Sequence, residues 1–296
     1  MITVFTPTYN RAYIIDNLYR SLLSQTDKDF EWVVVDDGST DDTAKYFEKV
    51  LKNDNGFNVT FVSVPNGGKH RAINKGVTLA KGEMFFIVDS DDYLTADAIE
   101  KIKKWKGTLP ADCKWAGVSG ARGYANGRVI GQMECEGEYV DATNLEREKK
   151  KLLGDKAEVY FTDVLRKYPF PEFENEKFLT EEVVWNKIAY DGYQIRWFKD
   201  IIYVCEYIED GLTKSGDAKY INNPRGVLYW AKQQTSFFKS NKKRVYSAIY
   251  RYYIATKQTK TKKQIRQDLG VSALKLNLAI FAVKTGRFIK RILRKN

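Results

Sequence analysis

The chain has 296 residues, a formal net charge of +11, and 14% aromatic residues. This length, with an apolar content of 43%, is typical of a packed protein of one or two domains and excludes an intrinsically disordered chain. Its three cysteines form no Cys-x-x-Cys pair, so neither a zinc site nor a disulfide framework is expected, and we infer a reducing cytosol. No stretch approaches the ~20 apolar residues that cross a bilayer, and the first residues predict a strand rather than a secretory leader.

The first third of the chain alternates between two kinds of pattern. Short β-prone runs predict strands at 2–6, 30–35, 57–64 and 83–88. Segments with one apolar face at helical spacing lie between them. Because proline cannot continue a central strand, the chain is expected to turn at Pro7. Strands that alternate with helices of about a dozen residues predict an α/β fold with a doubly wound, mostly parallel sheet.

Acidic side chains follow two of these predicted strands. Asp36 and Asp37 follow the second strand, and the sequence Asp-Ser-Asp-Asp at 89–92 follows the fourth. In open α/β sheets, ligands bind at the C-terminal ends of the strands. Three carboxylates within four positions repel one another unless a cation joins them, and their hard oxygens suit Mg²⁺ or Mn²⁺. We predict a metal and a phosphorylated ligand here; the alternative is a solvated acidic turn that caps the next helix.

Two common nucleotide-binding motifs are absent from the sequence. Neither a Gly-x-Gly-x-x-Gly fingerprint after the first strand nor a P-loop occurs. A nucleotide would therefore be held by carboxylates on its base and ribose, and by a metal on its phosphates.

The pattern changes after the fourth strand. Asn126-Gly127 between apolar runs predicts a hairpin, and residues 193–207 predict two short strands. Glu181 and Glu182 lie in the first turn of a predicted helix, where acids complement the helix dipole.

Several segments, in order over about residues 1–215, resemble the family 2 glycosyltransferases, which have a GT-A fold. They are Thr6-Pro7-Thr8-Tyr9-Asn10-Arg11, Val35-Asp36-Asp37-Gly38-Ser39, Asn66-Gly67-Gly68-Lys69, Ala72-Ile73-Asn74-Lys75-Gly76, Ala80-Lys81-Gly82-Glu83, Asp89-Ser90-Asp91, Thr180-Glu181-Glu182 and residues 206–213. Each segment alone is a weak signal, but the ordered set is specific. The resemblance implies metal-dependent transfer of a sugar, with inversion, from a nucleotide diphosphate donor, expected to be a UDP-sugar.

The resemblance also implies roles on the donor side. The implied donor-binding residues are Thr6, Pro7, Tyr9, Asp37, Lys69, Asp89, Ser90 and Asp91, and the implied ligands of Mn²⁺ or Mg²⁺ are Asp91 and Asp89. Asp37 would accept the base N–H, Tyr9 would pack beside the base, and Asp89 would bind ribose hydroxyls. Asp91 would bind the metal that bridges the diphosphate, and the adjacent Asp92 stays open as a second contact. Lys69 would add positive charge; its alternative role is a solvated first-turn lysine.

On the acceptor side, the resemblance points to the Glu181-Glu182 pair. By position Glu182 would be the general base that deprotonates the acceptor hydroxyl, and Glu181 would orient it. Glu182 stands where the family usually has Asp, which lengthens the arm by one methylene. The alternative is that both acids only complement a helix dipole. His70, the single histidine, is expected to be structural.

The end of the chain is strongly basic. Residues 219–296 contain 20 Lys and Arg but one acid, a formal charge of +19, and the rest of the chain carries −8. Aromatic helices are predicted at 227–238 and 245–254. The amphipathic segment 271–294 places Leu274, Leu278, Phe281, Phe288, Ile292 and Leu293 among cations. We expect 271–296 to lie on an anionic membrane surface. Packing on the catalytic domain, a homo-oligomer contact, or a nucleic-acid arm without a known reader motif are the alternatives.

The sequence therefore predicts a GT-A glycosyltransferase domain at 1–215 and a helical, basic extension at 216–296. The expected enzyme acts on a glycan or lipid-linked acceptor in cell-surface polysaccharide synthesis, peripheral at the inner face of the cell membrane, without binding nucleic acid. One rival is a sugar-phosphate nucleotidyltransferase, whose Gly-rich basic loop is missing here. The other is a non-enzymatic nucleic-acid-binding protein that uses the basic tail.

Overall fold

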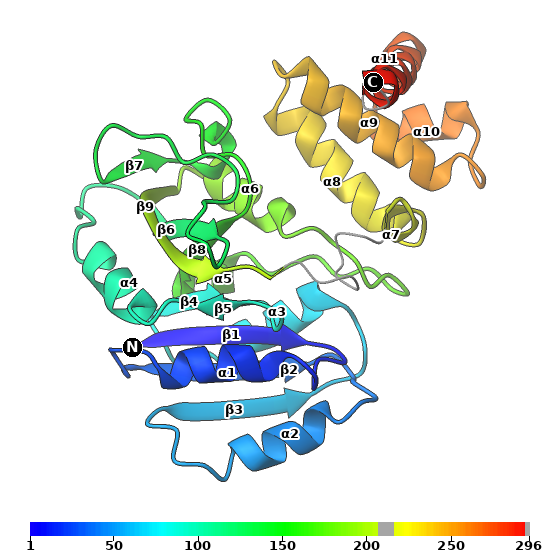
Figure 1. The fold of residues 1–296 in the computed structure, drawn as a ribbon. Helices are drawn as coiled ribbons and strands as arrows, with labels where there is room; N and C mark the ends of the chain where they lie inside the picture. Colours follow the sequence, from blue (N-terminus) through cyan, green and yellow to red (C-terminus); the bar gives the residue numbers. More distant parts are fainter. Residues whose placement is uncertain (207–215, 294–296) are drawn as a thin grey trace. The chain divides into compact units, whose positions relative to one another are not determined.

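The computed structural model describes residues 1–206 and 216–293, with side chains of the last helix described as far as Gly286 (Figure 1). Part of one segment that carries the family resemblance, 207–213, lies outside the described residues.

The chain divides into two compact units, and the division differs from a single cut near residue 215. Among the described residues, the first unit contains 1–170 and 184–206. The second contains 171–183 and 216–293. The segment 171–183 thus belongs with the helical extension rather than with the sheet.

The N-terminal half of the first unit is a parallel sheet, as predicted. Strands β1 (Ile2–Thr8), β2 (Phe30–Asp36), β3 (Asn58–Ser63) and β4 (Met84–Ile87) lie in the order β3-β2-β1-β4, and all pair in parallel. Every residue of β1 and β2 is buried, as expected for strands covered on both faces. The carboxyl ends of these four strands therefore meet at one edge of the sheet.

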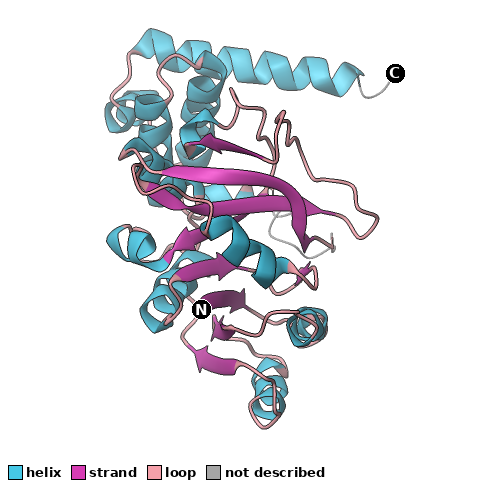
Figure 2. Cartoon of the chain, turned by 90° about the vertical axis from the view of Figure 1, so that its left-hand side faces the viewer, coloured by secondary structure: helices cyan, strands magenta, loops and turns pink. Residues whose placement is uncertain are grey.

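Helices cover both faces of this sheet, as Figure 2 shows for the first unit. They are α1 (Ile15–Leu23), α2 (Thr43–Val50), α3 (Lys69–Leu79), α4 (Ala98–Lys106), α5 (Thr162–Lys167) and most of α6 (Glu182–Tyr190). The face of α1 that is buried carries Ile15, Leu18 and Leu22, at helical spacing. Helix α3 lies so close to β1 that a Cβ on Gly76 would stand 2.1 Å from the Phe5 ring.

The remaining strands extend the sheet with mixed directions. Strands β8 (Lys156–Phe161), β6 (Trp115–Gly123), β9 (Gln194–Val204) and β5 (Tyr93–Leu94) follow β4, and β7 (Tyr139–Ala142) pairs with β9. Two short strands were predicted over 193–207, but the structure has one long strand there, β9. Its pairing with β6 shifts register at several points, so the strand is continuous but irregular. The predicted turn at Asn126-Gly127 forms, but the returning chain makes one bridge, Gly123 to Val129, instead of a strand. A short 3₁₀ helix, η1, spans Asn144–Glu146.

The turn expected at Pro7 is wrong, because β1 continues through Pro7 to Thr8. Pro7 pairs with Val35 of β2, whereas β4 accompanies β1 only from Ile2 to Phe5. The strand is therefore paired on one side where the proline lacks its N–H, which is how strands tolerate proline.

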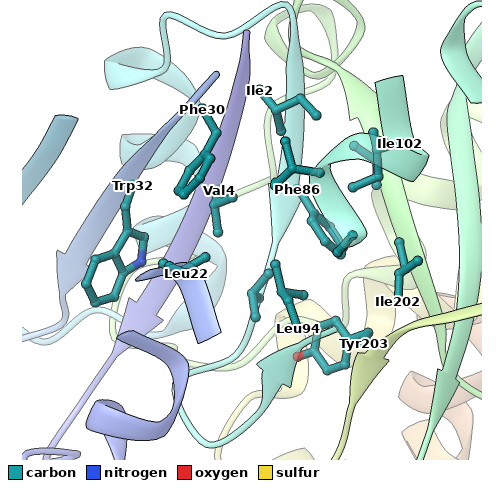
Figure 3. Packing of buried hydrophobic residues seen from close by; sticks show 14 of the residues in the cluster. Ile2, Val4, Leu22, Phe30, Trp32, Phe86, Leu94, Ile102, Ile202 and Tyr203 are labelled. Atoms are coloured by element: carbon teal, nitrogen blue, oxygen red, sulfur yellow. The ribbon is translucent and has the colours of Figure 1, made fainter. Parts of the chain in front are cut away.

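A large hydrophobic cluster lies in the core of the first unit. It gathers side chains from the sheet and from α1, α2 and α4 (Figure 3). The largest fully buried side chains include Trp32 of β2, Phe86 of β4 and Tyr203 of β9. Tyr203 pairs across the sheet with Leu94, two residues beyond the acidic turn that follows β4.

The second unit is helical. Its helices are α7 (Ala218–Ile221), α8 (Pro224–Phe237), α9 (Lys242–Thr256), α10 (Lys262–Leu269) and α11 (Ala273–Leu293), and α9 contacts both α8 and α11. The carboxylate of Glu176 accepts the N–H groups of Arg225 (2.7 Å) and Gly226 (2.8 Å) at the start of α8. Asn223 accepts the N–H groups of Lys177 and Phe178 in return. These bonds satisfy otherwise unpaired helix-end donors, and they explain why 171–183 belongs to this unit.

Helix α11 has two apolar faces. Leu276, Ala279 and Ile280 are buried, whereas Leu274 and Phe281 are about 70% exposed (69% and 70%). Among the described helices, none alone has the length and apolar character to cross a bilayer. Lys262–Leu269 and Ala273–Gly286 pass that test only together, as a pair bent by 101°.

Candidate functional site

The acidic turn after β4 lies at the carboxyl edge of the sheet and is held from β9. The Asp89 N–H donates to Tyr203 Oη (2.9 Å), and Tyr203 Oη donates to Asp92 Oδ2 (2.8 Å). The Glu206 N–H donates to Asp92 Oδ1 (3.1 Å). Tyr203 is fully buried and Asp92 nearly so, while Asp91 is half-buried. The turn is therefore fixed at both ends, and Asp91 lies between the two fixed points.

Two cations neutralise part of this turn. Lys69 Nζ, at the start of α3, lies 2.6 Å from Asp89 Oδ1, and Arg122 Nη1, in β6, lies 3.7 Å from Asp89 Oδ2 and 4.0 Å from Asp92 Oδ2. Three carboxylates thus lie beside Lys69 and Arg122, and the charge of Arg11 also acts on Asp91. The sequence predicts a metal here and positive charge from Lys69; the structure places Lys69 and also Arg122, which was not predicted, beside these acids.

The three carboxyl groups differ in their pKa values. Burial alone would raise the pKa of Asp89, but Lys69 and Arg122 outweigh it and hold that pKa below its usual range. Burial and the charge of Asp89 raise the pKa of Asp91. The same causes raise the pKa of Asp92 to about 7. Asp89 is therefore the firmly ionised member, paired with Lys69, whereas Asp91 and Asp92 gain most from added positive charge.

The second acidic pair lies at the end of β2 and holds the neighbouring turn. Asp37 accepts hydrogen bonds from the N–H groups of Gly67 (2.7 Å) and Gly68 (2.8 Å) and from Asn66 Nδ2 (3.1 Å). Gly68 has φ of +95° at the start of α3, which a glycine adopts without strain. Asp37 therefore positions the first turn of α3, from which Lys69 reaches Asp89. Asp36 binds Ser39 and Ser63 and is buried.

The segment after β1 completes this edge. Tyr9 is 47% exposed, and Asn10 adopts φ of +53° and bonds to Ser39 and Thr40. Thr6 is buried and its hydroxyl accepts a hydrogen bond from Trp32 Nε1. Pro7 and Ser90 lie at the ends of β1 and β4, and Ser90 is buried. His70 is buried in the first turn of α3, as expected of a structural histidine.

Three residues at this edge were missed by the sequence analysis: Arg122, Tyr203 and Thr8. Arg122 stacks 4.0 Å over the Tyr203 ring and donates from Nε to the Lys156 carbonyl. The only sequence signal was a charged residue within a strand of small residues, Gly120-Ala121-Arg122-Gly123. Thr8 is the third: among the described residues, its buried Oγ1 has no hydrogen-bond partner.

Glu181 and Glu182 belong to the second unit. Glu182, the first residue of α6, accepts a hydrogen bond from Trp230 Nε1 (2.8 Å) and forms an ion pair with Arg244. Arg244 also donates to Gln234. Glu181 contributes to the electrostatics of Lys219: burial and Arg251 lower the pKa of Lys219, whereas Glu181 opposes this shift. Glu182 thus has firm structural partners in α8 and α9, which the sequence analysis did not foresee.

The donor atoms at the acidic turn fit a divalent cation that also binds a substrate. Within the described residues, no three His, Cys, Asp or Glu side chains gather as a protein-only metal cage. Mg²⁺ is usually held by one or two carboxylates plus substrate phosphates, with water completing the shell. Asp91, with Asp89 beside it, supplies such carboxylates.

The comparisons with known proteins agree with this geometry. Residues 3–128 match the model of the glycosyl transferase family 2. Over 100 residues the chain is 40% identical to chondroitin synthase of Pasteurella multocida, a match that covers 34% of this chain and 10% of that protein. Over 101 residues it is 34% identical to the putative teichuronic acid biosynthesis glycosyltransferase TuaG of Bacillus subtilis, covering 34% and 40%. The match thus spans a minor part of these relatives.

Solved structures share the fold. TarS residues 1–349 of S. aureus, in complex with UDP-GlcNAc, has a TM-score of 0.65 and 21% identity, covering 94% of this chain and 81% of that one. The mannosyltransferase PcManGT from Pyrobaculum calidifontis, in complex with GDP-Man and Mn²⁺, has a TM-score of 0.55 and 18% identity, covering 100% and 88%. The predicted GT-A fold, a mixed α/β sheet followed by a helical region, is confirmed.

The bonds of Tyr203 predict that its hydroxyl fixes the acidic turn. Tyr203→Phe keeps the ring under Arg122 but leaves the Asp89 N–H and Asp92 without this partner. We expect the free energy of unfolding to fall by about 1–3 kcal/mol, and exchange of the Asp89 amide hydrogen to accelerate.

Tyr160→Phe is the matched control, because Tyr160 is also fully buried and, among the described residues, its hydroxyl has no partner. Denaturant unfolding and hydrogen exchange measure both variants. Equal behaviour of the two would contradict the role of Tyr203.

Proposed function

We propose that this chain, whose residues 3–128 match the model of glycosyl transferase family 2, moves a sugar from a UDP-sugar to a hydroxyl group. The transfer depends on Mn²⁺ or Mg²⁺ and inverts the anomeric centre. The observation that carries the proposal is the fixed turn at 89–92, where three carboxylates meet two cations at the carboxyl edge of the sheet. Asp91, whose pKa is raised by burial and by the charge of Asp89, gains from a divalent cation that arrives together with a diphosphate.

On the donor side, each residue has a separate task in this proposal. Asp91 holds the divalent cation, with Asp89 as second carboxylate and ribose contact. When bound, the cation supplies Lewis-acid stabilisation to the leaving diphosphate. Lys69 is already paired with Asp89 and adds positive charge on the same side. Tyr9 packs on the base, and Asp37 sets the turn beside it and accepts the base N–H.

In the transfer step, the acceptor oxygen attacks the anomeric carbon opposite the diphosphate. A carbon–oxygen bond to the acceptor forms as the bond to UDP breaks, and the hydroxyl proton passes to a carboxylate. The attack from the opposite side inverts the configuration.

The general base belongs to the pair Glu181 and Glu182. Glu182 corresponds in sequence to the residue that the family uses as base, and its carboxylate is bound to Trp230 and Arg244. A cation partner lowers the basicity of a carboxylate, because it stabilises the ionised form. We therefore keep Glu182 as the first candidate by position and treat its neighbour Glu181 as the direct rival.

The proposed acceptor is a glycan or a lipid-linked glycan in cell-surface polysaccharide synthesis. Support comes from the printed names of relatives, which include chondroitin synthase and a putative teichuronic acid biosynthesis glycosyltransferase. The proposed site of action is the cytoplasmic face of the membrane. This placement rests on the +19 charge of 219–296 and on the exposed Leu274 and Phe281 of α11.

The metal assignment predicts a selective loss of metal-linked binding. Asp91→Asn should bind UDP without metal about as well as the wild type, but lose the gain from Mn²⁺, roughly tenfold or more, since charge-assisted contacts contribute ~1.5–3 kcal/mol. Asp37→Asn should weaken UDP with or without Mn²⁺.

Calorimetry with and without Mn²⁺ separates these effects. Asp97→Asn removes the same charge from the partly exposed residue that precedes α4 and is the control. If Asp91→Asn keeps the full gain from Mn²⁺, Asp91 is not the metal ligand.

If Glu182 is the general base, its substitution should lower the rate of transfer without weakening donor binding. Glu182→Gln should bind the donor normally and lose transfer by ~10²–10⁴-fold, as for a general base. Turnover of a UDP-sugar is measured beside the affinity for UDP and the thermal midpoint.

Arg244→Gln is the comparison, because it removes the partner of Glu182 but leaves the carboxylate. A loss below tenfold in Glu182→Gln with a far larger loss in Glu181→Gln would move the role to Glu181. Unchanged rates in both variants would end the general-base assignment at this helix.

The membrane proposal predicts two separable contributions. High salt should reduce binding to anionic liposomes without abolishing it, because charge is screened and the apolar contact is not. Phe281→Glu with Ile292→Glu should abolish binding even at low salt, in co-sedimentation.

Gln267→Glu with Asn277→Glu adds the same charge at polar positions and should retain most of the binding. Deleting 271–296 should release the protein and leave its UDP affinity intact. Equal sedimentation of full-length and truncated protein would refute the membrane contact.

A further inference from the structure

One groove on the second unit is lined by cations and apolar side chains together. It has a volume of about 260 Å³ and lies at the beginnings of α9 and α11. Lys239, Lys242, Val245, Tyr246, Ser272, Leu274, Lys275 and Leu278 line it. No acidic side chain is among them.

The electrostatics of the groove favour an anion. Helices α9 and α11 both begin here, so the positive ends of two helix dipoles point toward it, and three lysines add full charges. Within the described part of the chain, none of these lysines forms an ion pair with an acid. The one acid of 219–296, Asp268, is bound to Lys260 (2.7 Å) and Tyr252 instead.

The apolar wall of the groove is continuous with an exposed surface. Leu274 and Leu278 line the groove and are 69% and 44% exposed, and Phe281 follows one turn later at 70%. These three residues lie four and three positions apart, on one face of α11. An anion that binds here is therefore placed beside a strip of hydrocarbon-compatible surface.

We propose that this groove binds the phosphate of an anionic phospholipid headgroup while Leu274, Leu278 and Phe281 enter the membrane interface. The inference rests on the proposed membrane location and names its ligand. The volume is below the ~300–1,000 Å³ of pockets that enclose drug-sized ligands, so the groove takes a headgroup rather than a whole lipid. The groove lysines and the apolar side chains then contact the membrane at the same place. Lys239 and Lys242 lie at the membrane surface together with α11.

The experiment compares two double variants with equal loss of charge. Lys239→Gln with Lys242→Gln alters the groove. Lys262→Gln with Lys263→Gln removes two exposed lysines of α10, outside the groove. The probes are dihexanoyl phosphatidylglycerol below its micelle concentration, and vesicles of phosphatidylcholine with and without phosphatidylglycerol. Affinities come from calorimetry and co-sedimentation on the full chain.

We expect the groove variant to bind the short-chain lipid roughly tenfold more weakly or worse, since each surface cation contributes ~1 kcal/mol, and the α10 variant to stay near the wild type. Thermal midpoints verify that both variants fold. Equal weakening in both variants would show a diffuse charge effect and overturn the groove, although membrane binding itself would survive.

The two proposals fail in different ways. Binding of the short-chain lipid without any vesicle binding would support the groove and refute the membrane location. Vesicle binding that depends on Phe281 but not on the groove lysines would overturn the groove alone. A concentration-dependent dimer that Leu278→Glu dissociates, with no lipid binding, would assign this surface to a second copy of the chain.

Discussion

The constraint on which the first unit depends is the repulsion among three carboxylates in the turn at 89–92. Lys69 and Arg122 offset two of these charges, and the Tyr203 hydroxyl bridges the turn from Asp89 to Asp92. The cations come from α3 and β6, and the tyrosine from β9, so the sheet must close before the turn is stable. Burial and the charge of Asp89 raise the pKa values of Asp91 and Asp92, so both carboxyl groups favour a cation that carries a diphosphate.

In the second unit, too, buried or partly buried acids are paired with hydrogen-bond donors and cations. Glu176 caps the start of α8, and Glu182 pairs with Arg244 and Trp230. The segment 171–183 thus supplies two acids, Glu176 and Glu182, to a unit in which residues 219–296 carry a charge of +19. Among the described residues, the three lysines of the groove (Lys239, Lys242 and Lys275) form no ion pair with an acid, which leaves them to an external anion. Folding of this unit and its proposed membrane contact therefore use different subsets of the same basic residues.

The sequence predicts those structural elements whose signals lie within a short stretch of the chain. Strand ends with acids, a helix that starts at Lys69, and an apolar stripe at Leu274 and Phe281 follow from periodicity and turn residues, and the structure confirms these elements. Arg122 and Tyr203 were not predictable, because their role depends on which strands become neighbours. The partners of Glu182 depend on packing in the helical unit. The strand through Pro7 was missed because pairing on one side only is a property of the sheet, not of the residue.

The central claim is that the acidic turn binds a nucleoside diphosphate together with a divalent cation. The most direct test is calorimetric titration of the wild-type chain with UDP, with and without Mn²⁺, beside a mixed oligonucleotide. We predict that UDP binds and that Mn²⁺ strengthens this binding roughly tenfold or more, whereas the oligonucleotide binds weakly and loses its affinity as salt increases. Tight oligonucleotide binding, with no heat from UDP in either condition, would contradict the account.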